Sequence, residues 1–151
     1  MARTEESMEA AKCIFCGTNA EQTICATPEG VPMRPCTCPR CGDFEYDPIF
    51  KRYAPQSEEA MVLISAWVRA QNGAGIVPVK VTADAAQRVM SGRRPRFSDR
   101  AMRALAVIAR KYPDLQTPEI TEKLASDLEL QALSYYGNAE EVFTLILILF
   151  D

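Results

Sequence analysis

The sequence predicts an α+β fold that is mostly helical, with a small region of β-hairpins at the amino-terminal end and a helical bundle after it. Two observations lead to this prediction. All six cysteines lie within the first 41 residues, and prolines are frequent in the same stretch, which argues against helix there. From residue 57 onward, apolar residues recur instead at the spacing of helices. We therefore assign residues 1–55 to the first part and residues 56–151 to the second.

The composition is that of an ordinary globular chain, and it narrows the classes of function. With 48% of its 151 residues hydrophobic and 25% charged, the chain is long enough for one modest core and a small appendage. A net charge of −3 does not indicate an obligate nucleic-acid partner. The first residues are acidic without an apolar run, and the longest apolar stretch, residues 142–150, is shorter than the roughly 20 residues of a membrane span. We expect a cytoplasmic protein that contacts no membrane.

The cysteines form two C-x-x-C pairs, and these are the strongest signal in the chain. Cys13 pairs with Cys16 and Cys38 pairs with Cys41, and a glycine follows each second cysteine, where it allows a turn with positive φ. The reducing cytosol disfavours disulfides, and structural Zn²⁺ takes four tetrahedral ligands. We predict one structural Zn²⁺ held by these four thiolates in a zinc ribbon, a small metal-binding fold of β-hairpins.

Other interpretations of the cysteines remain open. A redox pair needs only one C-x-x-C, usually at the start of a helix, so a second matched pair would be unexplained. A disulfide framework does not suit the compartment. Cys36 lies two residues before Cys38 and competes with it for the fourth ligand position, whereas Cys25 fits a buried apolar position or a spare thiol.

The residue types present argue against catalysis. The chain has no histidine for proton transfer near neutral pH, and a metal bound by four thiolates has no open position at which to activate water. Neither a Ser-His arrangement nor a glycine-rich phosphate loop can be formed from the sequence. We expect a protein that is not an enzyme.

The first predicted helix follows the cysteine region. Ser57 fits its N-cap, and Asn72 followed by Gly73 ends it. Trp67 falls on its apolar face, and a core position suits it better than an exposed stacking position. A short extended segment is predicted next, at residues 75–81.

Two more capped helices follow that segment. Thr82 fits the N-cap of the first, which ends at Gly92, and Ser98 fits the N-cap of the second. On the second helix we expect an apolar face opposite a basic face. The apolar face comprises Met102, Leu105, Ile108 and Tyr112.

Basic residues gather in residues 88–111, whereas acidic residues dominate residues 112–151. One interpretation is a phosphate-binding surface for nucleic acid, formed by Arg93, Arg94, Arg96, Arg100 and Arg103. The other is that the basic helix pairs with the acidic segment inside the fold. The second is favoured, because the acidic segment follows directly and only Phe97 is interleaved for stacking.

The last third predicts two helical segments separated at Gly137, with Asn138 and Glu141 matching a capping box. The final helix is apolar nearly all round, so we expect its uncovered side to be an interface. The interface residues are Phe143, Ile146, Leu147 and Phe150. Either two copies form a homodimer through this surface, or the chain continues into a further domain.

The combination of CxxCG and CPxCG with SAWVRAQN (residues 65–72), Pro78 and Thr82 resembles the start of a group of bacterial proteins. Its members join an amino-terminal zinc ribbon to a helical, winged-helix-like region, and some carry an effector such as a TIR domain linked to phage defence. The stretch LELQALSYYGNAEEV (residues 128–142) is similar to the group's later segment. The resemblance covers most of the chain and implies a winged-helix-like bundle, incomplete here because no wing strands follow Phe150.

Two functional hypotheses follow. In the first, the chain is a regulatory or sensing module, part of a bacterial defence system, whose arginines bind DNA or RNA. In the second, it is a docking or oligomerisation module that binds a partner protein or a second copy and no nucleic acid. We expect a non-enzymatic binding module with one Zn²⁺.

Overall fold

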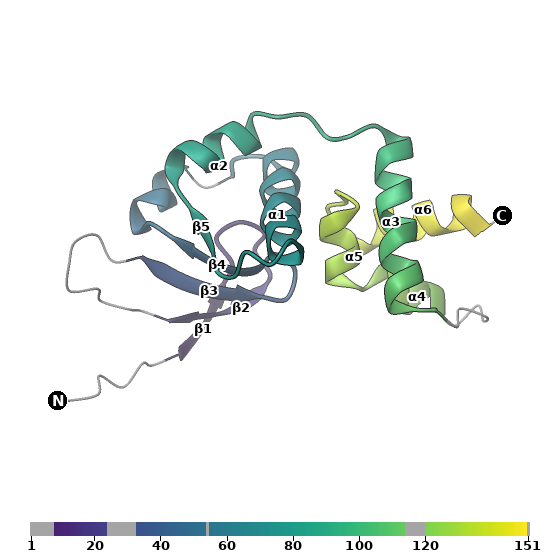
Figure 1. The fold of residues 1–151 in the computed structure, drawn as a ribbon, viewed down its shortest axis with the longest axis horizontal. Coiled ribbons are helices and arrows are strands. Elements are labelled where there is room, and N and C mark those ends of the chain that lie inside the picture. Colours follow the sequence, from purple (N-terminus) through teal and green to yellow (C-terminus); the bar gives the residue numbers. More distant parts are fainter. Residues whose placement is uncertain (1–7, 24–32, 54, 114–119, 151) are drawn as a thin grey trace.

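The computed structural model describes residues 8–23, 33–53, 55–113 and 120–150 (Figure 1). These residues form one five-stranded sheet and a set of helices, which confirms the predicted α+β class. No helix in this part of the chain is both long and apolar enough to cross a lipid bilayer.

The sheet runs in chain order from one edge to the other. Its strands are β1 (Met8–Lys12), β2 (Asn19–Thr23), β3 (Arg34–Cys38), β4 (Gly42–Tyr46) and β5 (Val79–Val81). The first four are antiparallel neighbours, and β5 pairs with β4 in parallel. β1 and β3 are both antiparallel to β2, so they run in the same direction and finish at the same end of the sheet. The turns that follow them therefore lie close together.

A 3₁₀ helix, η1 (Pro48–Tyr53), leads from the sheet to α1 (Glu58–Gly73), and β5 is followed by α2 (Ala83–Met90). The predicted caps are confirmed: the Ser57 hydroxyl accepts a hydrogen bond from the N–H of Ala60, and the Thr82 hydroxyl accepts one from Ala85. The apolar side of α1 covers the sheet. Trp67 is partly buried against the same core, as expected for a core position.

The core on the sheet is built around stacked aromatic side chains. Phe15, from the turn after β1, stacks on Phe44 of β4 with ring centroids 4.6 Å apart and meets Phe50 edge to face at 5.2 Å. Ile64 and Val68 of α1 pack into the same cluster and are fully buried. Burial of this many large rings stabilises the sheet, which would otherwise have little apolar area of its own.

The remaining helices form a second core. They are α3 (Phe97–Lys111), α4 (Ile120–Ala125), α5 (Leu128–Leu133) and α6 (Ala139–Phe150). The side chain of Asn138 accepts a hydrogen bond from the N–H of Glu141, as predicted for the start of α6. The start of α3 differs from the prediction, because the helix begins at Phe97 and its N-cap residue, Arg96, makes no side-chain cap.

The buried face of α3 also differs from the predicted one. Met102 is 66% exposed, and the residues buried in the core are Ala101, Ala104, Val107 and Ile108. Of the predicted face, Ile108 is buried in this core and Tyr112 packs against it, partly buried. Two alanines on the buried face allow α3 to approach its neighbours closely, so the small residues face the core and the long Met102 side chain faces outward.

The two cores divide the chain between α2 and α3, whereas the division at residues 55 and 56 stays a prediction. The reason is that α1, β5 and α2 pack with the cysteine-bearing strands: β5 extends the sheet beside β4, and α1 lies across it. On its other side α1 contacts α5, which joins the two parts (Figure 1). Within the described residues every strand belongs to the one sheet, so no wing strand accompanies α3–α6.

Candidate metal centre

The first cysteine turn, residues 13–17, connects β1 to β2. The N–H of Cys13 donates to the carbonyl of Thr18, and the N–H of Gly17 donates to the carbonyl of Cys13, both at 2.8 Å. Gly17 has a φ of 69°, a left-handed conformation that costs glycine little. These bonds close a tight loop, and Cys13 and Cys16 come from the same loop.

The second cysteine turn, residues 38–42, connects β3 to β4. The N–H of Cys41 points to the sulfur of Cys38 at 3.4 Å, an arrangement in which a backbone donor stabilises a thiolate. Gly42 has a φ of 92°, and a Cβ placed on it would lie 2.0 Å from Oδ1 of Asn72. Both the backbone conformation and the close approach of Asn72 therefore require glycine here.

The two turns bring together the four predicted cysteines, Cys13, Cys16, Cys38 and Cys41, whose sulfur atoms all lie within 4.8 Å of one another. Cys13 Sγ is 3.8 Å from Cys41 Sγ, and Cys16 Sγ is 3.5 Å from Cys38 Sγ. A tetrahedral zinc ion with bonds of about 2.3 Å separates its sulfur ligands by about 3.8 Å. The four residues therefore fit a tetrahedral metal ion.

The other two cysteines do not belong to this group. Cys36 is buried on the same face of β3 as Cys38, because alternate residues of a strand share a face, but its sulfur is not among the four that converge. It extends the core beside the metal site. Cys25 lies outside the described residues.

Four thiols this close cannot all ionise without a cation among them. Hydrogen bonding with Cys16 raises the pKa of the Cys13 thiol to about 12, and hydrogen bonding with Cys13 raises the pKa of Cys38 and Cys41 well above the usual value. Hydrogen bonding with Cys13 lowers the pKa of Cys16. A divalent cation removes this repulsion, since it favours the thiolate form of every ligand.

One face of α1 holds the second cysteine turn in place. Ser65, Arg69 and Asn72 are spaced four and three residues apart, so they share a face of the helix. The hydroxyl of Ser65 lies 3.4 Å from the sulfur of Cys41, and Arg69 donates to the carbonyl oxygens of residues 38, 39 and 40. Asn72 exchanges hydrogen bonds of 2.6 and 2.9 Å with the backbone of Asp43.

Sequence reasoning missed the role of these three residues. The signal was present in the polar residues of SAWVRAQN, which recur at helical spacing within an otherwise apolar helix. Such polar positions on a buried helix need hydrogen-bond partners, and here the partners are the cysteine turn and its flanks.

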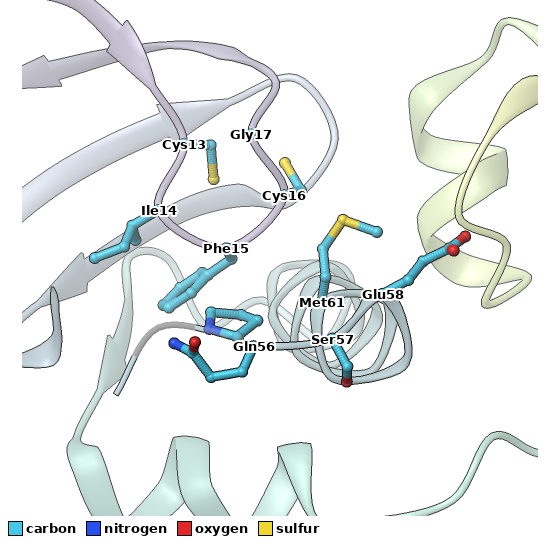
Figure 2. A pocket seen from close by; sticks show the side chains of 10 residues that line it. Cys13, Ile14, Phe15, Cys16, Gly17, Gln56, Ser57, Glu58 and Met61 are labelled. Carbon is cyan, nitrogen blue, oxygen red and sulfur yellow. The ribbon is translucent and has the colours of Figure 1, made fainter. Parts of the chain in front are cut away.

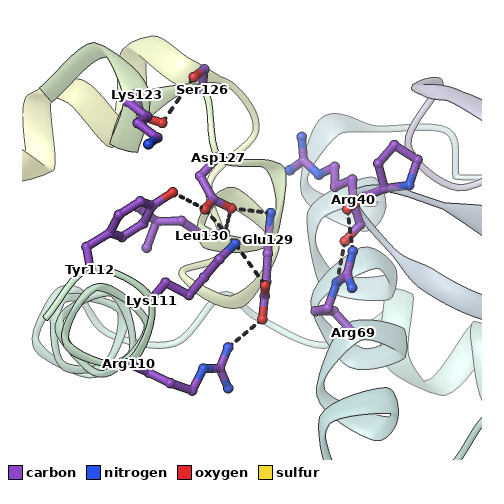
Figure 3. Close-up of polar contacts among 11 residues, drawn as sticks. Arg40, Arg69, Arg110, Lys111, Tyr112, Lys123, Ser126, Asp127, Glu129 and Leu130 are labelled. Carbon is purple, nitrogen blue, oxygen red and sulfur yellow. Dashed lines mark hydrogen bonds and ion pairs between the residues drawn. The ribbon is translucent and has the colours of Figure 1, made fainter. Parts of the chain in front are cut away.

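Arg40 links the second cysteine turn to the helical part of the chain. The residue is only 3% exposed. Its guanidinium donates to the side chain of Gln131 at 3.3 Å, to the carbonyl of Gly137 at 2.7 Å and to the carbonyl of Tyr136. Arg69 and Arg40 lie next to each other between the sheet and α5 (Figure 3). Two positive side chains thus lie close to the cysteine cluster, which carries a net charge of −2 with a divalent ion bound.

The first cysteine turn borders a shallow pocket of about 440 Å³. Figure 2 shows the turn above the beginning of α1, with Met61 and Glu58 projecting from the helix at the pocket's edge. Cys16 is only partly buried, whereas the other three cysteines of the cluster are fully buried. Solvent therefore reaches the metal site from this side, which gives an ion a path of entry.

The five predicted nucleic-acid-binding arginines lie in different surroundings. Arg94 forms an ion pair of 3.7 Å with Glu141, and the guanidiniums of Arg100 and Arg103 lie over the rings of Tyr136 and Tyr135. The side chains of Arg93 and Arg96 are exposed and make no hydrogen bond or ion pair with any described residue. The structure therefore divides the set into three arginines with internal partners and two without.

The basic end of α3 pairs with the acidic segment, as the second interpretation of the charges expected. Asp127 accepts hydrogen bonds from Lys111 at 2.6 Å and from the hydroxyl of Tyr112 at 2.7 Å (Figure 3). Glu129 pairs with both Lys111 and Arg110. Burial by itself raises the pKa of Asp127, but the bonds from Lys111 and Tyr112 outweigh it and leave that pKa below the usual value.

The predicted interface residues on α6 differ in their exposure to solvent. Phe143 and Leu147 are 37% and 52% exposed, whereas Ile146 is 4% exposed and packs in the second core. Ile146 is therefore a core residue, because it falls on the side of α6 that faces the other helices. The side chain of Phe150 lies outside the described part. Ile148, which was not in the predicted set, is 59% exposed.

No family model matches the chain, and no curated protein or solved structure shows significant similarity to it.

Proposed function

We propose that this protein is a non-enzymatic, zinc-binding interaction module of the zinc-ribbon type. The observation that carries the proposal is the convergence of four cysteine sulfurs from two hairpin turns. An all-sulfur tetrahedral donor set suits Zn²⁺ or iron and does not suit Mg²⁺ or Ca²⁺. We choose Zn²⁺ because two C-x-x-C turns that close a tetrahedron form the usual structural zinc site. The ion stabilises the fold and holds no substrate.

A protein is the partner that the surface supports best. Three of the five candidate arginines are engaged by acidic or aromatic side chains of the same chain. Large apolar side chains are exposed on α3 and α6. Phe97 of α3 and Ile148 of α6 line the same pocket, so this exposed apolar surface is continuous between the two helices. Apolar surface of this kind is typical of protein-binding sites. The resemblance to bacterial zinc-ribbon proteins agrees with a recognition role in a sensing or defence system.

Nucleic acid is the second candidate, and one observation favours it. The side chains of Arg93 and Arg96 are exposed and have no partner among the described residues, and Phe97, which follows Arg96 directly, is 47% exposed. Two free guanidiniums beside an exposed ring can contact a phosphate backbone and stack on a base.

Metal analysis of the purified protein tests the zinc assignment. We expect one zinc per chain, lost when Cys13, Cys16, Cys38 or Cys41 is replaced by serine and retained in Cys36→Ser. The matched control is informative because Cys36 is also buried, so loss of zinc through mere destabilisation would appear there too. A colourless protein with zinc supports the proposal. A protein with iron, or with no metal after preparation under reducing conditions, contradicts it.

Fluorescence anisotropy with labelled DNA and RNA at low salt separates the two candidate partners. A protein-binding module shows no saturable binding to either. Binding that is weakened by Arg93→Gln with Arg96→Gln, with a flatter dependence on salt, would establish the second candidate, because each phosphate contact contributes a slope of about −0.9 on duplex DNA.

A further inference from the structure

A pocket of about 320 Å³ lies between the start of α3 and α6, away from the cysteine cluster. One side comes from α6, where the lining residues repeat at helical spacing and share a face. They are Glu141, Thr144, Leu145 and Ile148. The other side comes from the segment that enters α3 and from the loop before α6. Its residues are Arg94, Phe97, Arg100 and Tyr136.

The two arginines of this pocket have hydrogen-bonding capacity that the described residues do not use. The guanidinium of Arg100 lies over the ring of Tyr136, 4.7 Å from its centroid, and donates no hydrogen bond to any described residue. Arg94 approaches Glu141 only to 3.7 Å, beyond hydrogen-bond distance. The Nε atoms of both are inaccessible to solvent and have no hydrogen-bond partner among the described residues. The Nη groups of the two side chains also make no hydrogen bond with a described residue, and it is these donors that an acceptor bound in the pocket would pair with.

The charge and shape of the pocket define what it would accept. Two guanidiniums against the single carboxylate of Glu141 leave a formal charge of +1, which one negative charge balances. A carboxylate matches the planar guanidinium and accepts two parallel hydrogen bonds from it. Phe97 and Ile148 are 47% and 59% exposed beside these charges and offer apolar contact. A volume near the lower end of the roughly 300–1,000 Å³ of ligand sites restricts the ligand to a small molecule.

We propose that this pocket binds a small monocarboxylate that carries an apolar chain or ring. Arg94 and Arg100 hold the carboxylate, and Phe97, Leu145 and Ile148 contact the apolar part. The site lies outside the cysteine cluster, so the proposal does not depend on the zinc assignment. It goes beyond a docking function, because it makes the helical part a receptor for a small anion.

Titration of hexanoate into the full-length, isotope-labelled protein, followed by NMR, tests the proposal. We expect saturable shifts at Arg100, Thr144 and Ile148. Hexanol, the neutral molecule of matched chain length, should bind about tenfold or more weakly, because it lacks the charge that the guanidiniums pair with. Arg94→Gln and Arg100→Gln should each weaken hexanoate binding by about tenfold or more.

Two further variants make the test specific. Thr144→Phe fills the pocket without changing its charge and should also abolish binding. Arg93→Gln removes a neighbouring exposed arginine that does not line the pocket and should leave binding unchanged. If Arg100→Gln does not fold, Arg94→Gln and Thr144→Phe decide the matter.

Four results would overturn the proposal: no saturable shift with hexanoate, equal binding of hexanol, equal weakening by Arg93→Gln, or tighter binding of inorganic phosphate at the same residues. The last would assign the pocket to a different class of anion.

Discussion

Arg40 donates a hydrogen bond of 2.7 Å from its Nη1 atom to the carbonyl oxygen of Gly137, a residue 97 positions further along the chain. Arg40 lies between the two cysteines of the second turn, and Gly137 lies in the loop between α5 and α6. The position of the metal-binding turn and that of the final helix are therefore coupled through one buried side chain. Arg69 donates to the carbonyl of Arg40 itself at 2.8 Å and supports the same turn from α1.

Replacement of Arg40 by methionine should destabilise the whole chain without removing the metal. The change keeps the length of the side chain but leaves the acceptors at Gln131, Tyr136 and Gly137 without their donor. We expect the free energy of unfolding to fall by roughly 3 kcal/mol, the upper range for hydrogen bonds to a charged group. Urea unfolding followed by helical circular dichroism measures it, with metal content determined in parallel.

The control for this variant is Arg52→Met, which removes an exposed arginine from η1 and should change the stability little. If Arg40→Met is no less stable than Arg52→Met, Arg40 does not couple the two parts.

Replacement of Gly42 by alanine should be more destabilising than replacement of Gly17. Both glycines have positive φ, and a side chain there costs about 1–2 kcal/mol. At Gly42 the new Cβ also overlaps Oδ1 of Asn72, whereas at Gly17 it meets nothing within 4 Å. Comparison of the two variants by urea unfolding isolates the cost of that overlap.

The double variant Gly42→Ala with Asn72→Ala completes this comparison. Removal of the Asn72 amide relieves the overlap, so the two changes together should cost less than the sum of their separate effects. Strict additivity would mean that the contact between these residues is not what requires glycine at position 42.

Replacement of Asp127 by asparagine should lower stability at neutral pH and have no effect in acid. The folded-state pKa of Asp127 is lowered, so its carboxylate contributes stability above the unfolded pKa of about 3.9, and that contribution is lost as pH falls through the folded value. Asparagine retains an N-cap acceptor for α5, so the variant removes mainly the charge. We expect a loss of about 1–2 kcal/mol at pH 7.

The measurement is the unfolding free energy of both proteins between pH 7 and pH 3, with the exposed Asp99→Asn as control. The difference between wild type and Asp127→Asn should narrow below about pH 4. A difference that stays constant across this range would show that the charge of Asp127 does not contribute.

Two adjacent residues of α6 should respond oppositely to a negative charge. Leu147→Glu places the charge on an exposed position and should change self-association or partner binding while leaving stability almost unchanged. Ile146→Glu buries an unpaired charge in the second core and should unfold the helical part. Light scattering and thermal unfolding distinguish the two. If Leu147→Glu affects neither association nor partner binding, the exposed side of α6 is not an interface.

Local sequence signals predicted many parts of this structure correctly. The N-caps at Ser57 and Thr82, the break at Gly137 and the pairing of each C-x-x-C with a following glycine depend on neighbours within about four residues. The convergence of four cysteines was also predictable, because metal-ligand spacing is itself a local pattern repeated twice.

Tertiary structure decided which arginines are engaged, where β5 lies and which face of α3 is buried. No local sequence signal distinguishes Arg40 from Arg94. In the structure, Arg40 is buried against the α5–α6 loop, whereas Arg94 lines a pocket. The side of α3 that is buried depends on how closely Ala101 and Ala104 allow it to approach the other helices. These outcomes depend on contacts between residues far apart in the chain, whose energies come from packing and desolvation that exist only after the helices and the sheet have come together.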